Sequence, residues 1–192
     1  LPEVRLEPEQ ALALINAIKD WLDKDDVVTE TGAETPYYAA LPRPYRAKNG
    51  PLESLEELLA IKGVTKELYY GTEDTPGLAS CLTLYGTGPK ININTAPRLV
   101  LRILSKDMTT EMIDEMDEYR RDPQNDLASP SWFRNLGSMR DVNVAAGWID
   151  VKSDVFRISA QGRSGGMTES VSGIVYRDRN KQTLRLLSWR VF

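Results

Sequence analysis

The chain has 192 residues, of which 41% are hydrophobic and 27% charged, a composition typical of a globular protein with one domain or two small ones. It contains no histidine, which excludes His-based catalytic triads and His-ligated metal sites. A single cysteine, Cys81, excludes an internal disulfide and a four-cysteine zinc site.

The net charge of −4 is unevenly distributed. Residues 1–60 carry six Lys and Arg against twelve Asp and Glu, whereas residues 129–192 carry ten against five. This asymmetry indicates two surfaces of opposite sign, and the acidic one suits a cation better than a nucleic acid. No segment approaches the roughly 20 apolar residues that cross a bilayer. Because the chain starts at Leu1 without a Met, we expect a piece of a longer protein.

The first two thirds of the chain predict helices separated by loops. Helical spacing of apolar residues predicts a helix over about residues 8–23, with an apolar stripe of Leu14, Ile15, Ile18, Trp21 and Leu22. A long turn-rich stretch follows over residues 23–51, and loops of this length are often functional. Ser54 and Glu57 have the spacing of a capping box, which predicts a helix that ends at Gly63.

Further helices are predicted after Pro97 and around residues 112–119, the second with a solvated charged face over residues 114–121. After Trp148 the period changes to two and predicts three strands, the last two joined by a turn at residues 177–181. Helices grouped first and strands grouped last predict an α+β fold, with a helical domain over residues 1–150 and C-terminal β-strands over residues 151–192. A sheet of three strands also needs a cover on its apolar face, and no helix of this sequence is an obvious candidate.

The acidic stretch at the end of the first helix is the most informative feature. Six carboxylates fall within fifteen residues: Asp20, Asp23, Asp25, Asp26, Glu30 and Glu34. Carboxylates this close repel one another, and a calcium ion with six to eight oxygen ligands relieves the repulsion. Asp23, Asp25 and Glu34 match positions 1, 3 and 12 of an EF-hand loop.

Val27 and Val28 occupy positions 5 and 6 of that loop, where a ligand and a glycine are required, so an EF-hand is excluded. Two interpretations remain: a calcium loop of another type, or a solvated acidic helix end. Carboxylates are unfavourable at the negative end of a helix dipole, which favours the metal.

The segments Ile61–Thr65 and Ile91–Ala96 resemble parts of helix-hairpin-helix modules, whose Gly-apolar-Gly turn brings backbone N–H groups to phosphate. The second glycine is missing in Gly63-Val64-Thr65, and residues 61–128 are net negative, which opposes binding to nucleic acid. The sequence also lacks a nucleophile with a base, an oxyanion hole and a cofactor loop, so we expect no enzyme.

Taken in order, several segments resemble one family over essentially the whole chain. They are Asp20–Asp25, Gly32–Glu34, Tyr37-Tyr38, Pro44–Leu52, Ile61–Val64, Ile91–Thr95 and the closing Leu187–Arg190. The sequence is similar to the large minor pseudopilin of type II secretion systems, general secretion pathway protein K (GspK).

The resemblance implies a pilin-like antiparallel sheet with a large inserted helical domain of SAM-like or helix-hairpin-helix-like units. It further implies a periplasmic domain held in the inner membrane by a single N-terminal helix, which this sequence lacks. Assembly with two other minor pseudopilins (GspI-like and GspJ-like) at the pseudopilus tip is implied too, as is calcium binding by the helical domain. By position, Asp23, Asp25 and Glu34 would lie in the calcium region, with Asp20 and Asp26 less central. The alternative is a helix-hairpin-helix module that binds nucleic acid, for which a basic middle third would be expected.

Overall fold

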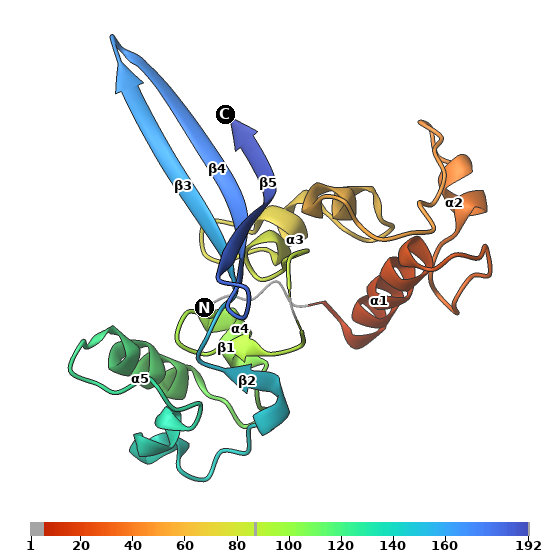
Figure 1. Ribbon diagram of the computed structural model, residues 1–192. Helices are drawn as coiled ribbons and strands as arrows, with labels where there is room; N and C mark the ends of the chain where they lie inside the picture. Colours follow the sequence, from red (N-terminus) through yellow and green to blue (C-terminus); the bar gives the residue numbers. More distant parts are fainter. Residues whose placement is uncertain (1–5, 87, 192) are drawn as a thin grey trace. The chain divides into compact units, whose positions relative to one another are not determined.

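A computed structural model describes residues 6–86 and 88–191, and the chain forms two compact units, residues 1–84 and 85–192 (Figure 1). Unit 1 is built from α1 (Pro8–Leu22), α2 (Thr35–Ala39) and α3 (Lys66–Tyr70), with 3₁₀-helices at Leu55–Ala60 and Leu78–Ser80. Long loops connect these elements, including the turn-rich stretch between α1 and the first 3₁₀-helix.

The first helix begins and ends within one residue of its prediction, but its buried face is different. Leu14, Ala17 and Trp21 are buried as expected, together with the polar Asn16 and Asp20. Contrary to the predicted stripe, Ile15 is 62% exposed and Leu22 is 38% exposed. Apolar residues lie on two faces of α1, and the face that turns inward is the one whose polar side chains find partners in the following loop.

The capping box at Ser54 and Glu57 is confirmed, and it opens the 3₁₀-helix Leu55–Ala60. Thr65 caps α3 by accepting a hydrogen bond from Leu68 N at 3.1 Å. These short elements enclose an aromatic core in which Trp21 meets Tyr38 edge to face, with ring centroids 5.2 Å apart. Ala33, Leu58, Ile61 and Tyr69 complete the buried cluster of unit 1.

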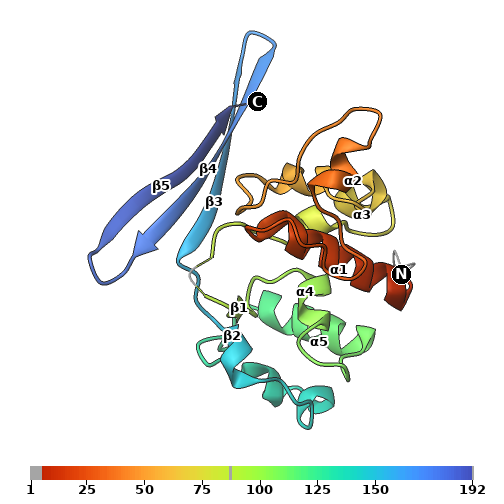
Figure 2. The same ribbon diagram turned by 90° about the vertical axis from the view of Figure 1, so that its right-hand side faces the viewer.

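Unit 2 contains α4 (Arg98–Arg102), α5 (Thr110–Arg121) and three 3₁₀-helices, Trp132–Asn135, Gly137–Met139 and Ala146–Trp148. Two short strands, β1 (Ile91–Asn92) and β2 (Ile149–Asp150), pair in parallel beside α4 and α5 (Figure 2). This pairing brings the two ends of the helical segment together. The core beneath it includes Ile93, Leu101, Met116, Trp132 and Met139, all at most 2% exposed.

The charged face predicted for α5 is only partly solvated. Asp117 is buried, and the Arg120 guanidinium ion-pairs with it at 2.6 Å. The same guanidinium donates to the carbonyl oxygens of Ile93 at 3.1 Å and Ala96 at 2.8 Å. These two residues therefore connect α5 to the turn that follows β1, a role that a count of charges along the helix does not predict.

The three predicted strands are confirmed: β3 (Val155–Ser164), β4 (Met167–Asp178) and β5 (Thr183–Val191). They form an antiparallel sheet in the order β3-β4-β5, and β3 and β4 form one long hairpin (Figure 1). Gly165 and Gly166 close this hairpin with φ of 54° and 85°, the left-handed region that two-residue hairpin turns need.

One face of this sheet is apolar and largely exposed. In the strand register, Ile158 lies opposite Gly173, which lies opposite Trp189, and Val175 joins Phe156 to Leu186. Residues directly opposite share a face. Large side chains on this face remain at least 38% exposed: Phe156, Ile158, Met167, Leu184, Leu186, Trp189 and Val191.

Helices together with an antiparallel sheet confirm the α+β prediction. Chain contacts group residues 85–150 with the sheet, so the compact units divide the chain at residue 84. The predicted division into a helical domain over 1–150 and β-strands over 151–192 concerns an insertion into the sheet domain, and it stays a prediction.

Candidate metal centre

Three carboxylates from the acidic stretch meet in unit 1. Asp20 lies in the last turn of α1, Asp23 caps the end of that helix, and Glu34 immediately precedes α2. Asp20 and Glu34 are fully buried, and Asp23 is half-buried. One carboxylate oxygen from each residue lies within 4.8 Å of the other two. The loop between the two helices thus returns Glu34 to the end of α1.

Several oxygens of this group are buried without a hydrogen-bond partner. They are Oδ1 of Asp23 and both Oε1 and Oε2 of Glu34. The two oxygens of Asp20 accept from a single donor, the backbone N–H of Thr29, at 3.1 and 3.2 Å. Leaving a buried acceptor unsatisfied costs about 1–3 kcal/mol, and more when it is charged. Three such oxygens in one place have the chemistry that a cation would satisfy.

The carboxylates destabilise one another's ionised forms. The pKa of Glu34 is raised from its ordinary value of 4.5 to about 7, chiefly by burial and then by the negative charges of Asp20, Asp23, Asp26 and Asp25, in that order. Asp20 and Asp23 also lie at the C-terminal end of α1, where the helix dipole disfavours anions. A bound cation reverses both effects because its charge favours the ionised carboxylates.

Asp25 and Asp26 do not join the group of three oxygens. The Oδ1 atom of Asp25 accepts from the backbone N–H of Val27 at 2.9 Å, which closes a local turn. Oδ1 of Asp26 accepts from the side-chain amide of Asn49 at 3.2 Å. Both aspartates are exposed, yet their charges still act on Glu34. Their role as ligands stays a prediction.

Asn49 is a candidate ligand that the sequence analysis missed. Its side-chain amide donates to the carbonyl oxygen of Asp25 at 2.8 Å and to Asp26, while its Oδ1 is buried without a partner. The backbone of Asn49 has a φ of 48°, an uncommon conformation outside glycine. An uncharged residue fifteen positions after Glu34 carries no charge signal, so only the fold brings it to attention.

Gly32 lets the loop pass close to the site. A Cβ at this position would lie 2.1 Å from Oδ2 of Asp20 and 3.0 Å from the carbonyl oxygen of Asn16. The loop also turns at Glu30, whose φ is 44°, and closes with a hydrogen bond of 2.7 Å from Gly32 N to Thr29 O. Asn16 fixes the same segment through a 3.3 Å hydrogen bond to Oγ1 of Thr31.

The chemistry of this donor set suits a hard divalent cation. All candidate ligand atoms are oxygens, from carboxylates and an amide, and they come from the end of α1 and from irregular segments that follow it. Calcium accepts six to eight such oxygens in flexible geometry, whereas zinc and copper favour nitrogen or sulfur. The residues present therefore fit calcium.

The hairpin turn that resembles a phosphate-binding motif has its donors engaged within unit 1. The backbone N–H of Lys62 donates to Oη of Tyr38 at 3.3 Å, and that of Val64 donates to the carbonyl oxygen of Ile61 at 3.1 Å. With these donors used internally and an excess of acidic residues in residues 61–128, the geometry gives nucleic-acid binding no support.

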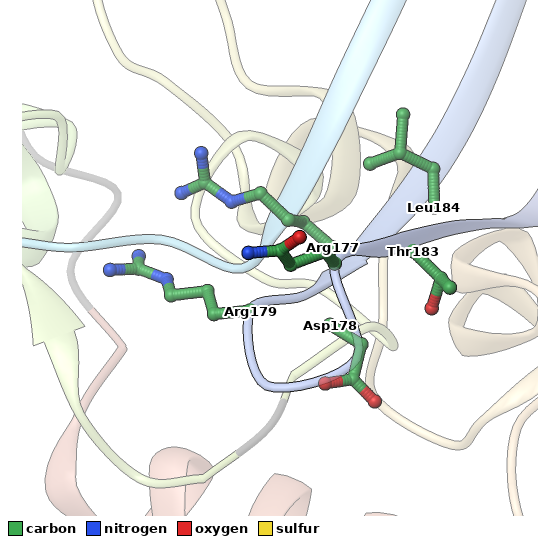
Figure 3. A pocket seen from close by; sticks show the side chains of 6 residues that line it. Arg177, Asp178, Arg179, Thr183 and Leu184 are labelled. Carbon is green, nitrogen blue, oxygen red and sulfur yellow. The ribbon is translucent and has the colours of Figure 1, made fainter.

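A hollow lies at the turn between β4 and β5, lined by Arg177, Asp178, Arg179, Gln182, Thr183 and Leu184. Figure 3 shows the side chains of Arg177 and Arg179 extending to the same side of this turn. Both guanidinium groups donate to the carbonyl oxygen of Ser153, and Arg179 ion-pairs with Asp154. These contacts hold the turn against the start of β3, so the arginines have a structural role.

Comparison with known proteins finds similarity to one family. Residues 1–73 match the family model of type II secretion system (T2SS), protein K. The chain is 30% identical over 165 residues to type II secretion system protein K of Pectobacterium carotovorum subsp. carotovorum, a match that covers 83% of this chain and 48% of that protein. Both matches are to the type II secretion system protein K family, to which this chain is similar in sequence.

Further relatives show the same similarity. Type II secretion system protein K of Aeromonas hydrophila is 41% identical over 70 residues, which cover 36% of this chain and 21% of that protein. The fold is similar to a chain in the crystal structure of the GspK-GspI-GspJ complex from enterotoxigenic Escherichia coli, with a TM-score of 0.69 and 19% identity, covering 97% of this chain and 65% of that chain. The match to the Pectobacterium protein shows that the chain spans about half the length of that relative.

Proposed function

We propose that this chain is the periplasmic part of a minor pseudopilin at the tip of a type II secretion pseudopilus, with calcium bound in its helical unit. The observation that carries the proposal is the protein K match, which extends over 83% of the chain. The role is structural: the protein supports export across the outer membrane without performing catalysis.

The proposed partners are two smaller minor pseudopilins, by analogy with the GspK-GspI-GspJ complex. The fold of this chain resembles that of one chain in that complex over 97% of its length. The proposal extends to a single N-terminal helix that anchors the parent protein in the inner membrane. Among the described residues, none of the helices has the length and apolar character that a bilayer span requires.

We further propose that the fold is a pilin-like sheet carrying an inserted helical domain. Pairing of β1 with β2 supports this, because it brings residues 91 and 149 together, so that the segment between them leaves and returns at one place. The exposed apolar face of β3-β4-β5 supports a cover of matching apolar character. The N-terminal helix of the parent protein is the proposed cover.

In the calcium site, Asp20, Asp23 and Glu34 would supply carboxylate oxygens, and Asn49 would supply its amide oxygen. Support comes from the buried oxygens of Asp23, Glu34 and Asn49 that have no hydrogen-bond partner. Bound calcium would neutralise the buried carboxylates and hold the loop before α2 against the end of α1. At about 100 times its dissociation constant, a ligand of the folded state adds about 2.7 kcal/mol to stability.

The function is tested by co-purification. The tagged chain, extended by its N-terminal helix, is expressed with the two smaller minor pseudopilins of the same organism, and we expect a ternary complex on size exclusion. Absence of that complex across a range of concentrations, with all three proteins folded, would contradict the proposed assembly.

The calcium site is tested separately by calorimetry and thermal melting of the chain in calcium and in EGTA. We expect EGTA to lower the melting temperature, and Glu34→Gln and Asp23→Asn to abolish that difference. Asp74→Asn, an exposed aspartate of the same unit, serves as the matched control. Asp25→Asn separates the sequence-based ligand set from the structural one, because a large loss of affinity would place Asp25 in the coordination sphere.

A further inference from the structure

Lys62 reaches the acidic loop from the hairpin turn that precedes α3. Its ammonium group donates to the carbonyl oxygen of Thr31 at 3.1 Å and to that of Gly32 at 3.0 Å. It also lies over the ring of Tyr37, 5.1 Å from the centroid. These contacts connect Lys62 to positions some thirty residues earlier in the chain.

The two carbonyls that Lys62 holds belong to the segment that shapes the metal site. Gly32 is the residue that approaches the carboxylate of Asp20 closely enough to exclude a Cβ, and Glu34 follows two residues later. Tyr37 lies in the short helix that Glu34 opens. Lys62 thus contacts residues on both sides of the fully buried Glu34.

The backbone of Lys62 adds a third connection. Its N–H donates to Oη of Tyr38, which is buried against Trp21 at the end of α1. Side chain and backbone of one residue therefore fix the loop, the start of α2 and, through Tyr38, the helix that carries Asp20 and Asp23.

We propose that Lys62 is a positioning residue for the calcium site, which holds Gly32 and Glu34 in the geometry that binds the cation. The inference rests on the proposed calcium function. The direction in which calcium affinity changes when Lys62 is replaced tests the proposal, because two effects of Lys62 on that affinity oppose each other. A positive charge near a cation site weakens binding, so that removing the charge alone should raise calcium affinity. Loss of positioning lowers affinity, and residues that orient metal ligands from outside the coordination sphere typically contribute about 10-fold to 100-fold.

The test compares Lys62→Met, Lys62→Arg and the control Lys66→Met by calcium titration calorimetry on chains shown by circular dichroism to be folded. We expect Lys62→Met to weaken calcium binding by about 10-fold or more, Lys62→Arg to retain most of the affinity, and Lys66→Met to leave it unchanged. If Lys62→Met does not fold, Lys62→Gln replaces it, since its amide can still donate to one carbonyl.

A second readout separates positioning from simple stabilisation. Loss of a purely structural contact lowers the melting temperature equally in calcium and in EGTA. Loss of a positioning residue also reduces the increase in melting temperature that calcium produces. Equal losses in both conditions, or affinity at or above that of the wild type in Lys62→Met, would overturn the proposal. A wild-type chain that binds no calcium would instead overturn the calcium function itself.

Discussion

Glu34 is fully buried, and neither of its carboxylate oxygens has a hydrogen-bond partner. Around it lie the like charges of Asp20 and Asp23. A residue in these surroundings is either protonated or neutralised by a cation, because an isolated ionised carboxylate is unfavourable in the protein interior. Protonation of Glu34 and the proposed binding of a cation are therefore two alternatives at one site.

This linkage predicts a pH dependence for the chelated protein. In the fold the pKa of Glu34 is raised from 4.5 to about 7, so the folded state binds the proton more tightly than the unfolded state does. The stabilisation is therefore complete below about pH 4.5 and is lost as the pH rises through about 7. Melting temperatures in EGTA across this range should fall more steeply for the wild type than for Glu34→Gln. Parallel curves would contradict the raised pKa.

Gly32→Ala tests the close passage of the loop. The new Cβ would lie 2.1 Å from Oδ2 of Asp20, so either the loop or the carboxylate must move. We expect a loss of about 1–3 kcal/mol of folding free energy, as for other overpacked positions, together with weaker calcium binding.

Gly50→Ala is the matched control for this substitution, since the nearest atom to its Cβ would be 3.8 Å away. Denaturant unfolding and calorimetry measure both effects. Equal behaviour of the two variants would show that the loop has room for a side chain.

Sequence spacing predicted part of this site and missed the rest for physical reasons. Asp20, Asp23 and Glu34 were among the predicted residues because charge density along the chain is visible in the sequence. Asp25 is a predicted ligand because the EF-hand template aligns it with a ligand position; it lies outside the group of three oxygens, and its role stays a prediction. Asn49 was missed, since its relevance arises from burial and from backbone geometry.

At the scale of elements, α1 shows why an apolar period alone does not identify the buried face. Ile15 and Leu22 fit a helical stripe, yet the structure leaves them exposed and buries Asn16 and Asp20. The polar face is the inner one because Asn16 and Asp20 form hydrogen bonds with Thr31 and Thr29 of the following loop. Where caps and turns dominate, as at Ser54 and Thr65, prediction from sequence succeeded because the interactions are local.

The connection between α5 and the turn after β1 predicts unequal effects for two neighbouring arginines. Both Arg120 and Arg121 ion-pair with the buried Asp117. Arg120 is largely buried and also donates to two carbonyls, whereas the side chain of Arg121 is 73% exposed. Arg120→Met should destabilise the chain by about 1–3 kcal/mol, because the carbonyl oxygens of Ile93 and Ala96 lose their donor.

The control, Arg121→Met, should change the free energy of unfolding by no more than about 1 kcal/mol, the usual range for an exposed pair. Denaturant unfolding of the two variants measures the contrast. Similar losses would mean that the carbonyl contacts of Arg120 contribute little.

At the scale of the whole molecule, the order of helices before strands was enough to predict an α+β fold. The division of the chain at residue 84 was not predicted. It falls in a stretch punctuated by Pro76, Gly77 and Gly86 that reads only as a loop. The pairing of β1 with β2 involves two residues on each strand, which is too short to leave a period in the sequence.

The apolar face of the sheet has the properties of an interior surface, although it is exposed in the residues described. Ile158, Leu186 and Trp189 are each at least 57% exposed and are neighbours across the strands. Contiguous apolar surface of this kind marks a contact site in soluble proteins. Ser159 follows Ile158 on the same strand and points to the opposite face, since side chains alternate along a strand.

This alternation supplies the last prediction, made for the chain extended by the proposed N-terminal helix. Ile158→Arg should prevent packing of that helix on the sheet and reduce recovery of the ternary complex, because it places a charge in the contact. Ser159→Arg adds the same charge on the other face and should leave recovery unchanged. Calcium affinity should stay at the wild-type value in both variants, because the three carboxylates of the metal site belong to unit 1, whereas residues 158 and 159 belong to unit 2. Recovery of the complex, measured by affinity purification, would contradict the proposed cover if Ile158→Arg matched the wild type.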